Sequence, residues 1–443
     1  MKGFMRPKGI QCPRVIAILY GVALLTGAAM HTAALWDGGA QIALHIQNGV
    51  PWVPHSRWYL YPLNRVIIEL AKIGLGSAAI VQLAGLIYSI FYIPFLVAII
   101  GVKLNARLQY RAIAGAVVAS FPIALFLGIE VIHSYWLLWA AAILLRGASY
   151  FQTALAVGCM LVGMISHPSS LLGLCIIAAF EGRNLIRAKN PRSILVASLA
   201  LCLLIVRLLW NILAASSYES GEYAIGRIAA QFWHGALGLP LLLLSASIIE
   251  WFGARYAIQK DSARRICVVY CMSLIIGIVW YIGDLSQWNT EVEYRKWLPI
   301  FSSCFLLWFY LDIEHGDGVY SSEGFGFPLG VLQRWSCSAA IVCTVLMACR
   351  WNQIWARLRE DMLASPTSIV RRSDLRWLAD TPLRYWSGSA TSLLVQGKQP
   401  KSVLLDEPIQ YFADNRIWIT PQIGIPTSGD LFIHENKNKM ERR

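Results

Sequence analysis

The hydrophobic and polar residues of this chain are segregated into long apolar runs and short polar segments. Runs such as 15–30, 80–100 and 193–206 contain no charged residue. Crossing the hydrocarbon of a bilayer takes about 20 apolar residues, and the backbone must satisfy its own hydrogen bonds there, which selects helices. The pattern predicts an all-α polytopic membrane protein with about 11 spans, at 14–34, 77–100, 112–128, 135–146, 151–165, 169–182, 194–214, 235–253, 266–283, 298–311 and 335–350.

The end of the chain has a different pattern. In residues 351–443, Pro, Gly and Ser separate short runs. We expect a helix at 352–363 and short strands at 402–405 and 416–420. The chain is therefore predicted to consist of a transmembrane domain, 1–350, and a small soluble tail of mixed α/β structure, 351–443, on the extracytoplasmic side.

Composition supports a membrane protein and argues against a soluble domain of similar size. The 443 residues are 57% hydrophobic and 14% charged, whereas a soluble globular chain has about 25% charged residues. The net charge is +13, but the basic residues gather in short loops between apolar runs. The positive-inside rule explains this distribution, so no nucleic-acid partner is predicted. The ten cysteines lie mostly within predicted spans and suggest neither a zinc site nor a disulfide framework.

The same basic residues predict the orientation of the helices. If the N-terminus lies in the cytoplasm, the inner loops 101–111, 181–193 and 254–265 hold most of the loop Lys and Arg. We therefore expect a multi-pass inner (plasma) membrane protein with a cytoplasmic N-terminus. The first apolar run resembles a signal peptide, but its length and the spans that follow favour an uncleaved helix.

With this orientation, acids and imidazoles collect on the outer face. Such groups are costly beside hydrocarbon and usually mark a site or a water-filled cavity. Arg207 lies in the outer third of an apolar span, where a cation needs a partner or a route to water. Each group also has a plain interpretation, as a solvated loop residue, a turn residue or a cation that reaches outward to water. The candidate substrate-binding residues are Arg57, Glu130, His133, His167, Arg207 and Arg295.

The first outer loop, 35–76, is the most informative segment. A short helix is expected after Asp37 and should stop at Asn48–Gly49, and a second is expected at 63–73. The apolar residues near His45 suit a helix that lies in the membrane interface. Several aromatic residues suit the depth of the lipid headgroups, namely Trp36, Trp52, Trp58, Tyr59 and Tyr61.

A first span followed by a long extracytoplasmic loop, with membrane-surface helices and an acid near its start, resembles the GT-C superfamily of polyprenyl-phosphate-sugar-dependent glycosyltransferases. At residue level the resemblance rests on Trp36–Asp37. It implies a GT-C-like fold and inverting transfer of a sugar from a polyprenyl-phosphate donor to a lipid or glycan acceptor. Asp37 would be the general base, and cationic side chains would bind the lipid phosphate. Two glycines follow Asp37 where some members carry a second acid, which leaves a divalent-metal requirement open.

Other functions stay open at this point. Asp37 is also a good helix N-cap. A transporter or flippase of a lipid or polysaccharide intermediate generally shows inverted repeats and charges at mid-membrane, whereas no repeat is evident here and mid-span charge is nearly limited to Arg207. A polysaccharide polymerase or ligase would share the chemistry of the outer face, and a non-catalytic assembly subunit is a further alternative.

Overall fold

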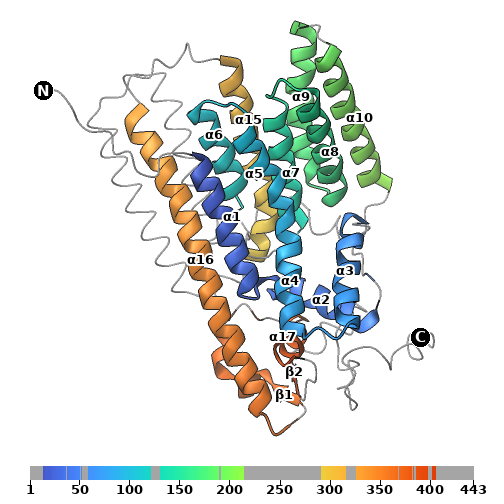
Figure 1. The fold of residues 1–443 in the computed structure, drawn as a ribbon, viewed down its shortest axis with the longest axis vertical. Coiled ribbons are helices and arrows are strands. Elements are labelled where there is room, and N and C mark those ends of the chain that lie inside the picture. Colours follow the sequence, from blue (N-terminus) through green and yellow to red (C-terminus); the bar gives the residue numbers. More distant parts are fainter. Residues whose placement is uncertain are drawn as a thin grey trace, which may run out of the picture.

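In the computed structural model the described part of the chain is nearly all helical (Figure 1). The structure describes residues 13–35, 37–49, 51, 58–120, 130–188, 191–213, 291–315, 326–367, 369–381, 383, 386–397 and 402–405. The predicted spans 235–253 and 266–283 lie outside these residues, as does most of the second half of the predicted span 112–128.

The α-helices follow the apolar runs of the sequence. They are α1 (Pro13–Ala29), α2 (Asp37–Asn48), α3 (Tyr61–Lys72), α4 (Ser77–Ser89), α5 (Ile93–Gly101), α6 (Ala106–Ile113), α7 (Glu130–Leu144), α8 (Tyr150–Ser166), α9 (Ser170–Ala188), α10 (Pro191–Leu213), α15 (Glu291–His315), α16 (Gly326–Ala364) and α17 (Trp386–Val395). Short helical turns join or extend them, namely η1 (Thr32–Ala34), η3 (Trp58–Leu60), η4 (Ile90–Tyr92), the π-helical η5 (Ala114–Val118), η9 (Arg372–Asp374) and η10 (Arg376–Asp380).

Three described helical segments are long and apolar enough to cross a membrane: Ser77–Gly101, Pro191–Trp210 and Ser336–Ala364. Shorter apolar helices cover Pro13–Ala29, Glu130–Leu144 and Tyr150–Ser166. Only 22% of the apolar window in Pro191–Trp210 is buried inside the protein, which suits a helix with a broad surface toward lipid. Within the described residues, helices of the length and apolar composition expected of membrane spans are therefore present at three of the predicted positions.

Several helices begin or end away from the predicted limits. α15 has 25 residues and α16 has 39, so both extend well beyond the predicted spans 298–311 and 335–350. Hydropathy misses their ends because those turns carry polar side chains, some of which pair with other helices. Asp312 near the end of α15, for example, accepts hydrogen bonds from two arginines of α6. α16 also runs through residue 350, where the transmembrane domain was predicted to end.

Helix α7 lies at the centre of the bundle, and all fifteen of its residues are buried. It packs against α5, α8, α9 and α15. Its tryptophans make polar contacts inside the bundle: Trp136 Nε1 donates to the Ala116 carbonyl at 3.0 Å, and Trp139 Nε1 donates to Ser302 Oγ at 2.8 Å. These bonds satisfy the indole N–H groups, which allows two large rings to be fully buried.

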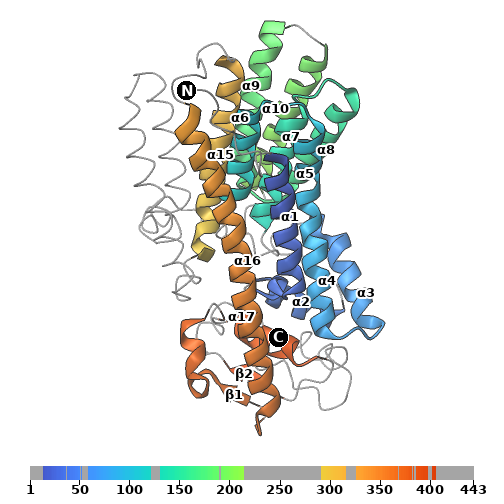
Figure 2. The same cartoon turned by 60° about the vertical axis from the view of Figure 1, so that its left-hand side comes forward.

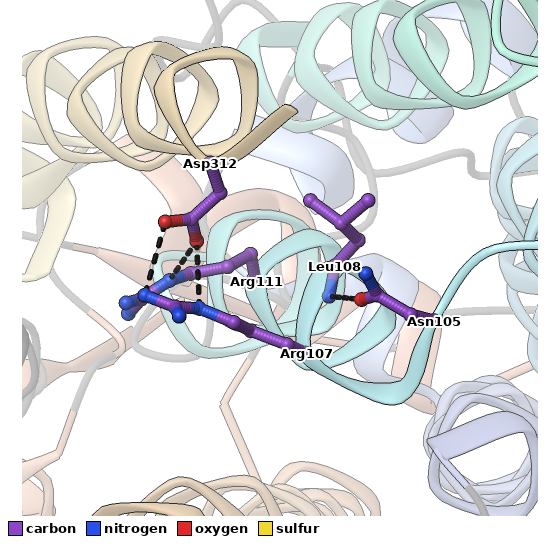
Figure 3. Close-up of polar contacts among 5 residues, drawn as sticks. All are labelled: Asn105, Arg107, Leu108, Arg111 and Asp312. Carbon is purple, nitrogen blue, oxygen red and sulfur yellow. Dashed lines mark hydrogen bonds and ion pairs between the residues drawn. The ribbon is translucent and has the colours of Figure 1, made fainter. Parts of the chain in front are cut away.

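The two ends of the bundle differ in the elements they carry. Helices α2 and α3 and the tail lie at one end, drawn lowest in Figures 1 and 2, and α6 lies toward the other. At the α6 end, Asp312 binds Arg107 and Arg111 (Figure 3). Two further ion pairs are Arg146–Glu181, which connects the turn after α7 to α9, and Arg183–Glu314, which connects α9 to α15.

The tail contains the predicted mixture of helix and strand in its described part. β1 (Ile369–Arg371) pairs in parallel with β2 (Val403–Leu405), and Val370 lies opposite Leu404. β2 coincides with the predicted strand at 402–405, whereas the predicted strand at 416–420 lies outside the described residues. The predicted helix at 352–363 is the last part of α16.

Candidate functional site

A buried group of polar and aromatic side chains surrounds the first turn of α7. His133 is fully buried there, and the Tyr59 hydroxyl lies 3.0 Å from its Nδ1. The Phe91 ring stacks on the imidazole, with 4.4 Å between ring centroids and 25° between planes. Tyr59 belongs to η3 in the first outer loop, so the loop reaches into the helix bundle at this point.

A second pair of residues extends this group toward α3. The Tyr88 hydroxyl of α4 donates to Asn64 Oδ1 of α3 at 3.2 Å, and both side chains are fully buried. Tyr88 lies beside His133, with 6.1 Å between ring centroids, and Glu130 lies about one helical turn before His133 on α7. We call Tyr59, Asn64, Tyr88, Glu130 and His133 the α7 polar cluster.

The α7 polar cluster combines groups that can bind a polar ligand and move protons. A neutral imidazole has one donor and one acceptor nitrogen, a phenol both donates and accepts, and a carboxylate accepts. These groups lie among apolar helices, where hydrogen bonds are stronger than in water. The structure thus brings the two predicted residues Glu130 and His133 to one place, as their i, i+3 spacing suggested.

His167 lies in a different polar group. It forms the C-cap of α8, and its Nδ1 lies 2.7 Å from Ser169 Oγ and accepts from the Ser169 N–H at 3.2 Å. The Ser169 carbonyl accepts from the Tyr135 hydroxyl, which also contacts Ser303 of α15 at 3.1 Å. His167 therefore orders the turn between α8 and α9, which fits the interpretation of His167 as a turn residue.

Asp37 is the first residue of α2, and Gly49, with φ +62°, ends that helix. The predicted start and stop are both confirmed. The structure does not describe the Asp37 side chain, so its place relative to the α7 polar cluster stays a prediction. Ile42, His45 and Ile46 of α2 are buried, with α3 on one side and α17 of the tail on another. Protein therefore covers the α2 surface that was expected to lie in the membrane interface.

Burial changes the chemistry of His45. Desolvation lowers the pKa of His45 to about 3, because an apolar environment disfavours the charged imidazolium. His45 is therefore neutral at physiological pH. This agrees with a structural role for His45 rather than with a cation that binds phosphate.

The predicted cationic residues are only partly described. Arg207 is a buried side chain of α10, 6% exposed. Arg295 lies in the first turns of α15, but its side chain is not described, and Arg57 lies outside the described residues. No group of three or more His, Cys, Asp or Glu side chains within the described ranges is placed to hold a metal ion.

Three members of the cluster, Tyr59, Asn64 and Tyr88, were missed from the sequence as site residues. Tyr59 was interpreted as a headgroup aromatic, but it is 9% exposed and bonded to His133. The one available signal was that Asn64 stands four residues before Ile68, on the same side of the amphipathic loop helix. Comparison with known proteins adds no further assignment: the chain matches no family model, no curated protein and no solved structure.

Proposed function

We propose that this protein is a membrane glycosyltransferase that transfers a sugar from a polyprenyl-phosphate donor to a lipid or glycan acceptor. The observation that carries the proposal is the contact between Tyr59 and His133, because it joins the first outer loop to an acid- and imidazole-bearing helix inside the bundle. Titratable groups within apolar helices usually serve a substrate or proton pathway. A lipid-linked sugar needs a binding site of this kind, which accepts both its polar headgroup and its apolar chain.

The proposed reaction is a single inverting displacement. The acceptor hydroxyl oxygen attacks the anomeric carbon, the bond between that carbon and the phosphate oxygen breaks, and the polyprenyl phosphate leaves with the bonding electrons. Asp37 takes the proton of the attacking hydroxyl, as a general base must. Glu130 and His133 bind sugar or acceptor hydroxyls, and His167 lies on the same outer face of the membrane. The charge of the lipid phosphate is balanced by the cations Arg57, Arg207 and Arg295.

The proposal includes a topology. The chain has about 11 spans in a GT-C-like arrangement in the inner membrane, with the N-terminus in the cytoplasm and the tail outside. Supporting this, the loop elements α2 and α3 and the tail lie at the same end of the bundle (Figure 2). The distribution of Lys and Arg supports an outer position for that end.

The test measures sugar transfer in membranes supplied with a labelled polyprenyl-phosphate sugar. Asp37→Asn keeps the size of the side chain and removes the base, so transfer should fall by about 100-fold or more. Glu69→Gln is the matched control, because Glu69 is an exposed loop carboxylate paired with Arg65 and Lys72. Wild-type turnover by Asp37→Asn at an equal protein level would refute the base assignment.

A second pair of variants tests the α7 polar cluster. Tyr59→Phe removes the hydroxyl that contacts His133, and we expect a higher KM for the donor or acceptor. Tyr61→Phe, two residues along the loop and 42% exposed, should leave KM unchanged. If purified protein in vesicles moves a lipid-linked intermediate across the bilayer and forms no covalent product, the protein is a transporter or flippase instead. Elongation of a glycan by repeating units would indicate a polymerase or ligase.

A further inference from the structure

The segments of the tail on either side of α17 are attached to the end of α16. Ser402 Oγ donates to the Met362 carbonyl at 2.6 Å, and Trp377 Nε1 donates to Asp361 Oδ2 at 2.8 Å. The Arg357 guanidinium lies 4.5 Å above the centre of the Trp377 ring. The described part of the tail is therefore folded against the last turns of α16.

Polar side chains within α17 and directly after it are buried and hydrogen-bonded. Ser392 Oγ accepts from the Leu404 N–H at 2.9 Å, and the Gln396 amide donates to the Ser392 and Ser402 carbonyls at 2.6 Å each. Residues 390–396 are all buried. A ten-residue helix is marginal alone, so burial on this scale indicates that α17 is held by its neighbours.

Those neighbours are α2, which belongs to the first outer loop, and the residues that flank this loop on either side. Ser77 Oγ, at the start of α4, contacts the carbonyls of Leu394 at 2.6 Å and Gly397 at 3.1 Å. Since the last carbonyls of a helix have no partner within it, Ser77 supplies one for the end of α17. Thr391 Oγ1 donates to the Ala34 carbonyl at 3.4 Å. Figure 1 shows α17 directly beneath α4 and next to α2.

The contact is closest at Gly39. A Cβ at this position would lie 2.5 Å from the Ala34 carbonyl oxygen and 2.9 Å from Thr391 Oγ1. The backbone of α2, the turn before it and α17 therefore meet so closely that position 39 has no room for a larger residue without movement. Ala34 and Gly39 lie on either side of Asp37 in the sequence, and Thr391 contacts both.

We propose that α17 is part of the site at the first outer loop, and that Thr391 and Ser77 are positioning residues that hold the backbone of α2 around Asp37. The inference that this positions a catalytic base rests on the proposed glycosyltransferase function. The inference that the tail holds α2 in place does not depend on that function. The tail is thus a working part of the protein and not an independent appendage.

The experiment uses the full chain in lipid nanodiscs and measures amide hydrogen exchange together with sugar transfer. Gly39→Ala should speed exchange in both α2 and α17 by about tenfold or more, since it forces the two apart. It should also lower kcat with little change in KM. Gly76→Ala is the matched control, because nothing lies within 4 Å of a Cβ there, and its φ is −68°. It should change neither measurement.

A second series avoids any dependence on how Gly39→Ala folds. Thr391→Val and Ser77→Ala remove one hydroxyl each and should speed amide exchange in α2. Thr391→Ser keeps the hydroxyl, so α2 should exchange as slowly as in the wild-type protein. If exchange rises in α17 while α2 stays protected, the tail does not hold α2 and the inference is wrong. If α2 loosens while kcat stays unchanged, the positioning role is wrong. If the wild-type protein transfers no sugar, the proposed function fails, and the coupled exchange alone decides whether α17 holds α2.

Discussion

Replacing Asp312 by Asn should markedly destabilise the bundle, because two arginines of α6 depend on this carboxylate. Asp312 Oδ2 accepts from Arg111 Nε at 3.1 Å and from Arg107 Nε at 3.3 Å, and Oδ1 lies 3.1 Å from Arg107 Nη2 (Figure 3). The Asp312 side chain is 6% exposed and that of Arg111 is 0% exposed. Asparagine keeps the shape of aspartate but removes the negative charge.

The size of the effect follows from the burial of the pair. Removing one partner of a buried ion pair costs about 3–5 kcal/mol, because the other charge stays buried and loses its counter-charge. Arg107 is 30% exposed and adds little, since exposed pairs contribute about 0–1 kcal/mol. At 1.4 kcal/mol for each factor of ten, the folding equilibrium constant should fall by a factor of about 100 to 4,000.

Unfolding by denaturant in detergent micelles measures this difference in free energy. Glu69→Gln is the control for loss of a carboxylate, because Glu69 and its partner Arg65 are 49% and 46% exposed; it should cost less than about 1 kcal/mol. The double variant Arg111→Met/Asp312→Leu removes both charges and should recover most of the loss. If Asp312→Asn costs no more than Glu69→Gln, or if the double variant is as unstable as the single one, the argument from the buried charge is wrong.

Three further predictions concern single positions. Because burial lowers the pKa of His45 to about 3 from an ordinary value of about 6.5, only the unfolded chain gains this proton as the pH falls between these values. Stability should therefore decrease by up to about 1.4 kcal/mol per pH unit below pH ~6.5, and His45→Gln should flatten the dependence; equal slopes would contradict it. His31 has φ +64°, and its ring stacks on Trp355 with 4.5 Å between centroids. Both His31→Gly and His31→Ala lose the stacking. Because glycine adopts the left-handed conformation without strain, thermal unfolding should find the Gly variant more stable than the Ala variant by about 1 kcal/mol. A Cβ at Gly115 would overlap the Trp139 ring, whereas one at Gly101 meets nothing within 4 Å, so Gly115→Ala should cost about 1–3 kcal/mol and Gly101→Ala much less.

Part of the candidate site could be predicted from the sequence. Glu130 and His133 stand three residues apart at the start of an apolar run, and helical periodicity alone places them on one side of α7. Their partners could not be predicted, because Tyr59, Asn64 and Tyr88 come from three other elements. Tyr59 in particular looks like a headgroup aromatic until the loop is seen to turn into the bundle.

The amino-acid sequence by itself determined the helical character of the described apolar segments, and it gave three of them the length and apolar composition that a membrane span needs, since local hydrophobicity and backbone hydrogen bonding suffice for that. It also determined the limits of α2 and the strand at 403–405, which depend on nearby turn and strand residues. Only the tertiary structure decided that Asp312 binds Arg111, 201 residues away, and that Ser77 contacts α17, 317 residues away. Such contacts depend on which helices pack together, and the hydrophobic pattern of any one segment is compatible with many neighbours.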